Sequence, residues 1–312
     1  MLPNFLIIGA EKAATTWLAR CLAEHRSIFV PPEKELFFFS TRFERGLDWY
    51  ASHFRDWSGE ARVGEATPVY LGHPQAPQRI RTTLGEVQLI VSLRQPVDRA
   101  YSAYWHNLRR GRISPDSEFN SCLESDAWEI RSRGEYFTHV GRYLQVFPQD
   151  RLLVLLYDRI QEDSARELRR CLEFLGVDPD FRPSTLQLRL NEGGVDITTA
   201  TGPVRKIRSA MRSGVLWTRR RGLLPLSLER RLVATADRVA RRTVTLAPRA
   251  RPYVPLDPAV RAELTDRHYR VQIDRLEDLL DVDLAGWRAA GSRPRSAAPA
   301  SDAVLAERPR PT

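Results

Sequence analysis

Residues that could bind phosphate stand close to the start of the chain. Lys12, Thr15 and Thr16 follow an apolar run that ends at Gly9. Residues 5–8 predict a strand buried on both faces, and a helix is predicted to begin within residues 13–16. The first backbone N–H groups of a helix have no partner inside it, and the helix dipole favours a negative charge there. The pattern therefore predicts a binding site for a phosphate or sulfate group.

A second candidate phosphate site follows another predicted strand, at residues 87–93. Arg94 comes directly after it, Pro96 opens a helix, and Ser102 lies further along that helix. A guanidinium group can bind a phosphate through two parallel hydrogen bonds, and a serine hydroxyl adds a donor. Asp98 and Arg99 are expected to form ion pairs within the helix or against a loop.

A third group contains a carboxylate that could move a proton. Glu35 lies in the sequence E-K-E-L-F-F-F, residues 33–39. A carboxylate beside apolar side chains loses hydration, which raises its pKa and suits a general base. The alternative is a loop whose charges face water while the phenylalanines fill the core.

The spacing of the first group distinguishes two kinds of phosphate loop. In the loop that binds nucleoside triphosphates, lysine directly precedes the Ser or Thr, whereas Lys12 precedes Thr15 by three positions. The K-x-x-T-T spacing resembles the loop of sulfotransferases that use 3′-phosphoadenosine 5′-phosphosulfate (PAPS), and R-x-P-x-x-R-x-x-S resembles their 3′-phosphate motif. K-E-x-x-F-F and E-x-T-P-x-Y resemble further motifs of the bacterial and heparan-sulfating members. The resemblance covers residues 4–180 well and 255–287 loosely.

The resemblance implies a role for each matching residue. Lys12 would stabilise the leaving phosphate, and Glu35 would take the proton of the acceptor. The implied donor site consists of Gly9, Lys12, Ala13, Ala14, Thr15, Thr16, Trp17, Arg94 and Ser102. The implied acceptor rim contains Glu65, Thr67 and Tyr70.

Two residues depart from the family pattern. Ala14 stands where the family usually has glycine, which is costly if that position needs a positive φ. Ala66 stands where heparan-sulfating relatives often have a lysine that contacts the substrate. The second departure argues against a polyanionic acceptor and leaves a carbohydrate, a glycolipid or a small natural product, sulfated on a hydroxyl or an amine.

The apolar pattern predicts the fold that would carry these sites. Alternating strands and helices with continuous apolar strands favour a parallel sheet covered on both faces. We therefore expect an α/β, P-loop-like three-layer fold, with a mainly helical C-terminal part and ligands at the carboxyl ends of the strands. The predicted strands are residues 5–8, 27–30, 61–63, 87–93 and 151–158, and the main later helices are 79–84, 134–147, 164–175 and 255–287.

The charge of the chain is unevenly distributed. The net charge is +9, but residues 205–251 alone carry fourteen Lys or Arg against two acids. For this basic block we consider a solvated helical face, a surface for an anionic acceptor or partner, and a peripheral membrane contact. We expect residues 1–288 to form one sulfotransferase domain with 204–250 as a basic helical insertion, and 289–312 to be a disordered tail.

Composition narrows the remaining alternatives. No apolar run approaches the ~20 residues of a membrane helix, and no signal peptide precedes the first strand. The three cysteines lack metal-ligand spacing. We therefore expect a cytoplasmic protein with no metal and no specific nucleic-acid partner, and the resemblance implies a bacterial one. Two rival hypotheses remain: a kinase-like phosphotransferase, and a non-enzymatic binder of nucleic acid or membrane.

Overall fold

A parallel β-sheet forms the centre of the protein. The computed structural model describes residues 1–187 and 253–288. Within them, the five strands lie in the order β2-β3-β1-β4-β5, all parallel. Their bounds are β1 Phe5–Gly9, β2 Ile28–Phe29, β3 Arg62–Ala66, β4 Gln88–Leu93 and β5 Leu152–Leu156.

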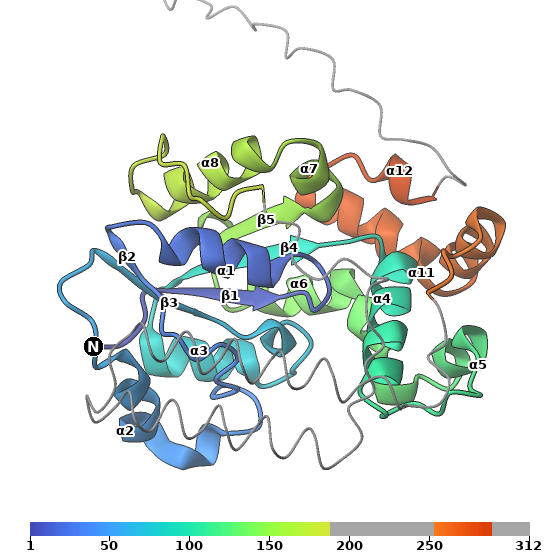
Figure 1. Ribbon diagram of the computed structural model, residues 1–312, viewed down its shortest axis with the longest axis horizontal. Helices are drawn as coiled ribbons and strands as arrows, with labels where there is room; N and C mark the ends of the chain where they lie inside the picture. The colour runs from blue at the N-terminus through green and yellow to red at the C-terminus, as the bar shows by residue number, and fades with distance from the viewer. Residues whose placement is uncertain (188–252, 289–312) are drawn as a thin grey trace, which may run out of the picture.

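Helices cover both faces of this sheet (Figure 1). The described α-helices are α1 Thr15–Ala23, α2 Gly46–Ala51, α3 Ala76–Leu84, α4 Pro96–Arg109, α5 Phe119–Glu124, α6 Tyr136–Leu144, α7 Tyr157–Glu162, α8 Ser164–Leu175, α11 Pro258–Leu280 and α12 Ala285–Arg288. Single 3₁₀ turns occur at Phe43–Arg45, Ser52–Phe54, Pro68–Tyr70, Ala127–Glu129, Ser132–Gly134 and Gln149–Arg151. Two separate apolar cores result, so the predicted three-layer α/β fold is confirmed.

The smaller core lies between the sheet and α1, α7 and α8. Leu18 and Leu22 of α1 pack with Leu168 and Leu172 of α8 against the strands. The larger core, on the other face, contains residues of α3, α4, α6 and α11, including Tyr269 of α11. Burying these side chains supplies most of the free energy that holds the layers together.

Several predicted boundaries were wrong by a few residues. The strand predicted at 61–63 continues to Ala66, because the residues 62–66 pair with β2 and β1. The strand predicted at 151–158 ends at Leu156, and Tyr157 and Asp158 begin α7. Asp158 accepts a hydrogen bond from the Trp287 indole at 2.8 Å, a contact 129 residues away in sequence.

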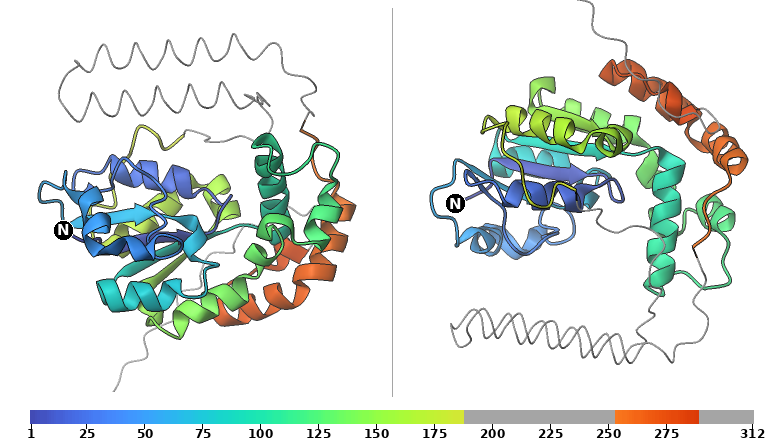
Figure 2. Two further views of the ribbon diagram at one scale, coloured as in Figure 1. Left: turned by 90° about the horizontal axis from the view of Figure 1, so that it is seen from below. Right: turned by 45° about the horizontal axis from the view of Figure 1, so that its top comes forward.

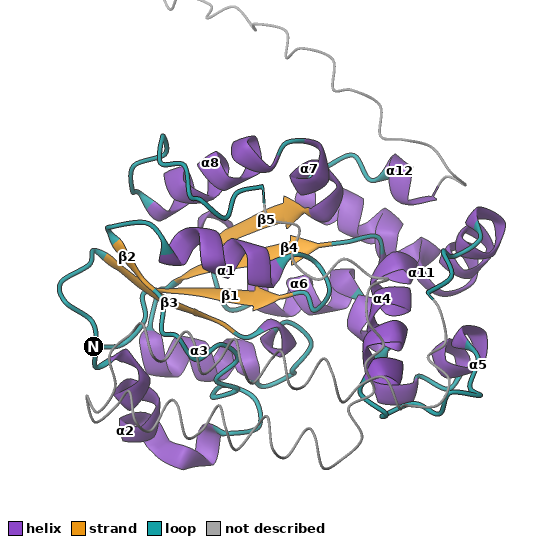
Figure 3. Cartoon of the chain, viewed as in Figure 1, coloured by secondary structure: helices purple, strands orange, loops and turns teal. Residues whose placement is uncertain are grey.

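Strand direction determines where ligands can bind. The arrows of β1, β4 and β5 point toward α4 (Figure 3), so the loops after β1 and β4 meet at one edge of the sheet. Views from below and from a tilted angle show α11 running along α4 and α6 (Figure 2).

Several predictions fall outside the described residues. These are the basic block at 205–251 with its predicted insertion at 204–250, and the tail at 289–312. Across residues 1–187 and 253–288, no helix combines the length and apolar character needed to cross a membrane.

Candidate active site

The loop between β1 and α1 exposes the first turn of the helix. Lys12 and Ala14 both have left-handed backbone conformations, with φ of 68° and 64°. Ala14 occupies the N-cap position and makes no side-chain cap hydrogen bond. Because the first helical bond runs from Leu18 N to Ala14 O at 3.0 Å, the N–H groups of residues 15–17 precede the helical ladder and can bind an anion.

Gly9 lets the start of this loop pack closely against Pro68 and Leu71. A Cβ on Gly9 would lie 2.6 Å from Cβ of Leu71 and 3.1 Å from the carbonyl oxygen of Pro68. Real side chains cannot tolerate the shorter contact, so glycine is required for steric reasons. Ala13 is fully buried. Gly9 and Ala13 thus shape the loop.

A cavity of about 720 Å³ lies directly in front of this helix end. Its volume is within the ~300–1,000 Å³ usual for small-molecule sites. It brings together seven of the nine predicted donor-site residues, namely Lys12, Ala14, Thr15, Thr16, Trp17, Arg94 and Ser102. The other lining residues are Asp98, Tyr101, Trp105, Arg109, Tyr157, Ile160, Gln161, Ser164, Leu186, Gln187, Tyr253 and Leu256. The two predicted phosphate sites therefore form one cavity.

Arg94 is held in an orientation that suits anion binding. Its guanidinium group stacks on the ring of Tyr157 with 4.7 Å to the centroid. Its Nη1 donates a long hydrogen bond of 3.4 Å to the carbonyl oxygen of Lys12. Arg94 therefore links the end of β4 to the loop after β1.

Neighbouring cations dominate the electrostatics of Lys12. Burial, followed by the charges of Arg109, Arg94 and Arg110, lowers the pKa of Lys12 to about 8, while Glu35 acts in the opposite direction. Placing several cations close together in a site that is partly shielded from water raises the free energy. A bound anion would lower it. This lowered pKa indicates a site built for negative charge.

Glu35 lies beside the loop, outside the lining of the large cavity. Its backbone has φ of 67°, and its N–H donates to the carbonyl oxygen of Ala66 at 3.1 Å. Its side chain is 41% exposed, whereas Phe38 and Phe39 are buried in the core. The expectation of an apolar environment around this carboxylate is therefore wrong: the phenylalanines turn inward, as in the alternative weighed for this loop.

Lys34 connects Glu35 to the phosphate loop. Its ammonium group donates to Thr16 Oγ1 at 2.9 Å and to Glu35 Oε1 at 3.1 Å. One cation thus fixes the predicted base and a predicted donor-site hydroxyl relative to each other. Sequence analysis did not assign Lys34 a role.

His106 is a further site residue that sequence analysis missed. It lies one helical turn after Ser102 on α4. Burial, then the charges of Lys12, Arg110, Arg109 and Arg112, lower the pKa of His106 to about 3. The imidazole is therefore neutral at physiological pH and can accept a hydrogen bond. Its i+4 spacing from Ser102 was the available signal.

Glu65, Thr67 and Tyr70 form a buried hydrogen-bonded cluster. Glu65 is 2% exposed and the other two are fully buried. Glu65 accepts hydrogen bonds from Thr67 at 2.6 Å, from Tyr70 at 2.8 Å and from Tyr50 at 3.2 Å, and burial raises the pKa of its carboxyl group. None of the three lines the large cavity. Their predicted contact with an acceptor stays a prediction, and the geometry gives them a structural role.

An ion pair and a hydrogen bond to other segments fix the helix that carries Ser102. Both carboxylate oxygens of Asp98 lie 3.1 Å from Nε of Arg261 on α11. Arg99 is fully buried and donates to the carbonyl oxygen of Ile130. Asp98 and Arg99 thus both pair with other segments rather than with each other.

A metal site is not visible in the described part of the chain. Among residues 1–187 and 253–288, no group of three or more His, Cys, Asp or Glu side chains could hold a metal ion. The three cysteines are buried and unbonded to one another.

Comparison with known proteins gives consistent matches. The model of the sulfotransferase domain family matches residues 2–192. The chain is 35% identical over 157 residues to the membrane-associated sulfotransferase kil1 of Dictyostelium discoideum, covering 47% of this chain and 32% of that protein. It is 32% identical over 186 residues to mouse heparan sulfate glucosamine 3-O-sulfotransferase 3B1, covering 56% of this chain and 46% of that protein.

A solved structure resembles the whole fold. The crystal structure of a sulfotransferase from Alicyclobacillus acidocaldarius has a TM-score of 0.67 and 27% identity, covering 93% of this chain and all of that one. The chain spans less than half the length of the curated relatives reported above.

Proposed function

Because this chain belongs to the sulfotransferase family, we propose that it transfers the sulfuryl group of PAPS to an acceptor. The acceptor would carry a hydroxyl or amine on a carbohydrate, glycolipid or small natural product. Neither membership of this family nor the spacing between Lys12 and Thr15 favours a kinase-like phosphotransferase. The observation that carries the proposal is the cavity that joins Lys12, the α1 helix end, Arg94 and Ser102.

The residues of this cavity fit the chemical parts of PAPS. Three cations, Lys12, Arg94 and Arg109, line a space that also contains the aromatic rings of Trp105 and Tyr253, 5.4 Å apart. Cations with hydroxyl and backbone donors suit two phosphate groups, and aromatic faces suit a purine. When bound, PAPS supplies an activated sulfuryl group on its 5′-phosphate.

Each loop residue then has a defined task in the proposed transfer. The N–H groups of residues 15–17 and the hydroxyls of Thr15 and Thr16 bind the 5′-phosphate. Arg94 and Ser102 bind the 3′-phosphate and fix its position. Lys12 stabilises the negative charge that grows on the bridging oxygen as the sulfur–oxygen bond breaks.

The acceptor must lose a proton as the new bond to sulfur forms. Glu35 is the proposed general base, and its exposed carboxylate can receive the proton and release it to water. Lys34 holds Glu35 beside Thr16.

Nucleotide binding tests this proposal directly. Calorimetry would compare 3′-phosphoadenosine 5′-phosphate (PAP), the product nucleotide, with AMP and ATP on the wild type, Arg94→Ala and Arg20→Ala. We expect PAP to bind at least tenfold more tightly than AMP or ATP. Losing the guanidinium contact should weaken PAP binding by about 1.5–3 kcal/mol, on the order of 10- to 100-fold.

Arg20 provides a matched control, because it is an exposed arginine at the far end of α1. Arg20→Ala should bind PAP like the wild type. Equal binding of ATP and PAP, or an Arg94→Ala variant that binds PAP normally, would contradict the proposed donor site.

A further inference from the structure

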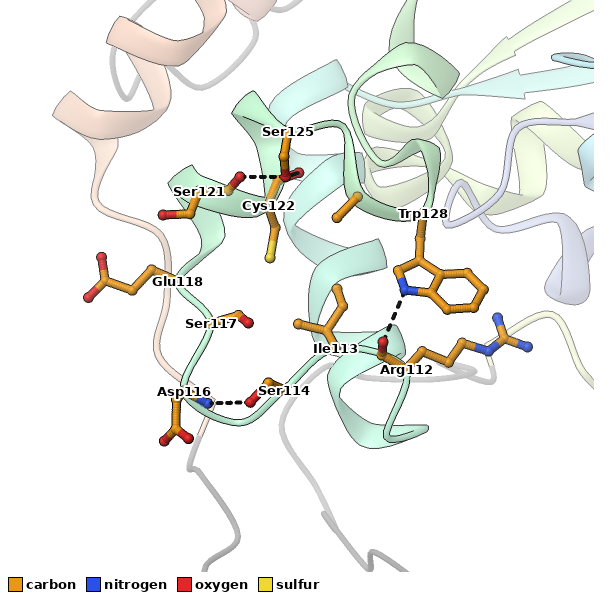
Figure 4. Close-up of a pocket in the computed structure, with 11 residues that line it drawn as sticks. Arg112, Ile113, Ser114, Asp116, Ser117, Glu118, Ser121, Cys122, Ser125 and Trp128 are labelled. Carbon is orange, nitrogen blue, oxygen red and sulfur yellow. Dashed lines mark hydrogen bonds between the residues drawn. The ribbon is translucent and has the colours of Figure 1, made fainter.

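A second cavity lies beyond the end of α4, separate from the proposed donor site. It has a volume of about 430 Å³ and shares no lining residue with the larger cavity. Figure 4 shows it between the Arg112 and Trp128 side and the Glu118 side. It is lined by Arg112, Ile113, Ser114, Asp116, Ser117, Glu118, Ser121, Cys122, Ser125, Ala127 and Trp128.

Trp128 is an exposed aromatic ring on a fixed backbone. It is 54% exposed, and Asp126, Trp128 and Glu129 all have positive φ, at 51°, 58° and 57°. Such conformations are strained and persist only where the surroundings impose them. Here Asp126 Oδ1 imposes them by accepting from the N–H groups of residues 131 and 132, at 2.7 and 3.0 Å.

The orientation of the Trp128 ring is also fixed. Its indole N–H donates to the carbonyl oxygen of Arg112 at 3.0 Å, and the Arg112 guanidinium lies 5.3 Å from the ring centroid. A large exposed apolar surface held in one orientation loses little entropy when a ligand stacks on it. Trp128 is therefore suited to stacking against a flat ligand face.

The rest of the cavity is polar and slightly acidic. Asp116 and Glu118 outnumber the single cation Arg112, and the serines at 114, 117, 121 and 125 add hydroxyl groups. The donor-site cavity has the opposite balance, with Lys12, Arg94 and Arg109 against Asp98. A polyanion would be repelled by the two carboxylates, whereas a ligand rich in hydroxyl groups could donate hydrogen bonds to them.

Ion pairs tie this cavity wall to the phosphate loop. Arg133 pairs with Glu129, next to Trp128, at 2.7 Å, and also with Glu11, next to Lys12. Arg112 is close enough to His106 to contribute to its lowered pKa, as Lys12 does. One arginine thus links the segment that carries Trp128 to the loop that carries Lys12.

We propose that the cavity bordered by Arg112 and Trp128 on one side and by Glu118 on the other is an acceptor subsite for an uncharged sugar unit, which stacks on Trp128 and donates hydrogen bonds to the exposed carboxylates of Asp116 and Glu118 at the rim. This inference rests on the proposed sulfotransferase function and narrows its acceptor. The acceptor is a glycan or glycoconjugate with a neutral sugar next to the unit that receives the sulfuryl group.

The test is an acceptor screen with kinetics on matched variants. An array of neutral oligosaccharides, polyanionic ones such as heparosan and hyaluronan fragments, and simple phenols would be incubated with PAPS and the full chain, and products detected by mass. Acceptor KM and kcat would be measured for the wild type, Trp128→Ala, Glu118→Lys and Trp57→Ala. Trp57 is a second exposed tryptophan, 36% exposed, in the loop after α2.

We expect transfer to neutral glycans. Trp128→Ala should raise the acceptor KM at least tenfold, with kcat within twofold and PAP binding unchanged, and Trp57→Ala should change neither. Glu118→Lys tests the subsite independently if Trp128→Ala fails to fold, and it should raise the KM for neutral glycans severalfold.

Three results would overturn the subsite: transfer only to polyanionic or non-carbohydrate acceptors, no transfer to any sugar, or an unchanged KM in both Trp128→Ala and Glu118→Lys. PAP binding separates this failure from failure of the proposed function. If the wild type binds PAP but gives one of these three results, the proposed donor site stands and the proposed subsite is wrong. If the wild type does not bind PAP, both the donor site and the subsite are wrong.

Discussion

Ala14 occupies a position of the phosphate loop where the backbone is strained. It adopts φ of 64° in the left-handed region, which an alanine enters at a cost of about 1–2 kcal/mol. The loop needs this left-handed conformation because it must turn from β1 into α1 within a few residues. The strain is therefore stored next to the proposed sulfuryl donor site.

Ala14→Gly should relieve this strain. We expect the free energy of unfolding to rise by about 1 kcal/mol, since glycine accepts positive φ but loses more entropy on folding. Thermal or chemical unfolding would measure it. Ala262→Gly, the same change inside α11, should have the opposite sign, with a loss of about 0.5–1 kcal/mol. A destabilised Ala14→Gly variant would show that this strain is absent.

Site residues could be predicted where local sequence alone determines their position. Each of five residues follows a predicted strand within nine positions, so parallel topology brings them together: Lys12, Thr15, Thr16, Arg94 and Ser102. The environment of Glu35 was not predictable, because burial of Phe38 and Phe39 depends on tertiary packing.

Residues that act through long-range contacts were also missed. Burial lowers the pKa of His106, and cations from the loop at Lys12 and from the end of α4 lower it further. Trp128 lies on a backbone that Asp126 stabilises, and no periodic pattern indicates a left-handed segment. For single residues, the sequence predicts which side chains are present but not which side chains surround them in the fold.

At the scale of elements, the order of strands and helices followed from apolar periodicity, because buried parallel strands are continuous apolar runs. The ends of the elements did not, since they depend on distant hydrogen bonds. Gln95, between β4 and α4, is the clearest example. It is fully buried, accepts from Asp98 N at 2.8 Å as the N-cap of α4, and donates to Thr265 at 2.6 Å and to the carbonyl oxygen of Trp287 at 3.2 Å.

Gln95→Ala should therefore destabilise the protein strongly. It removes a helix cap and leaves a buried carbonyl oxygen without this donor, for an expected loss of about 2–4 kcal/mol. Denaturant unfolding would measure the loss. Gln78→Ala, on the exposed face of α3, is the control and should change stability by less than ~0.5 kcal/mol. Equal stabilities of the two variants would refute a joining role for Gln95.

At the scale of the whole molecule, charge is divided between two cavities of opposite sign. The cations around Lys12 make its protonation depend on what the larger cavity contains. Without a ligand the pKa of Lys12 is about 8, and a bound anion should raise it by opposite charge. The protonated lysine binds the anion better, so binding takes up a proton near pH 8.

We therefore expect the contribution of Lys12 to PAP affinity to be constant below about pH 7 and to fall above pH 8, by up to tenfold per pH unit. Calorimetry at pH 7, 8 and 9, in buffers with different ionisation enthalpies, would measure both affinity and proton uptake. Lys12→Met should bind more weakly at all pH values and show no such uptake. A wild-type affinity that is the same at pH 7 and pH 9 would rule out this coupling.

The position of α11 also affects how the chain folds during synthesis. The last strand, β5, ends at Leu156, but Leu264, Tyr269, Ile273 and Leu276 of α11 complete the larger core. At about 5–20 residues per second, the ribosome needs roughly 6–25 seconds to extend the chain from β5 to the end of α11. During this interval the apolar sides of α4 and α6 lack their partner helix and stay exposed to solvent.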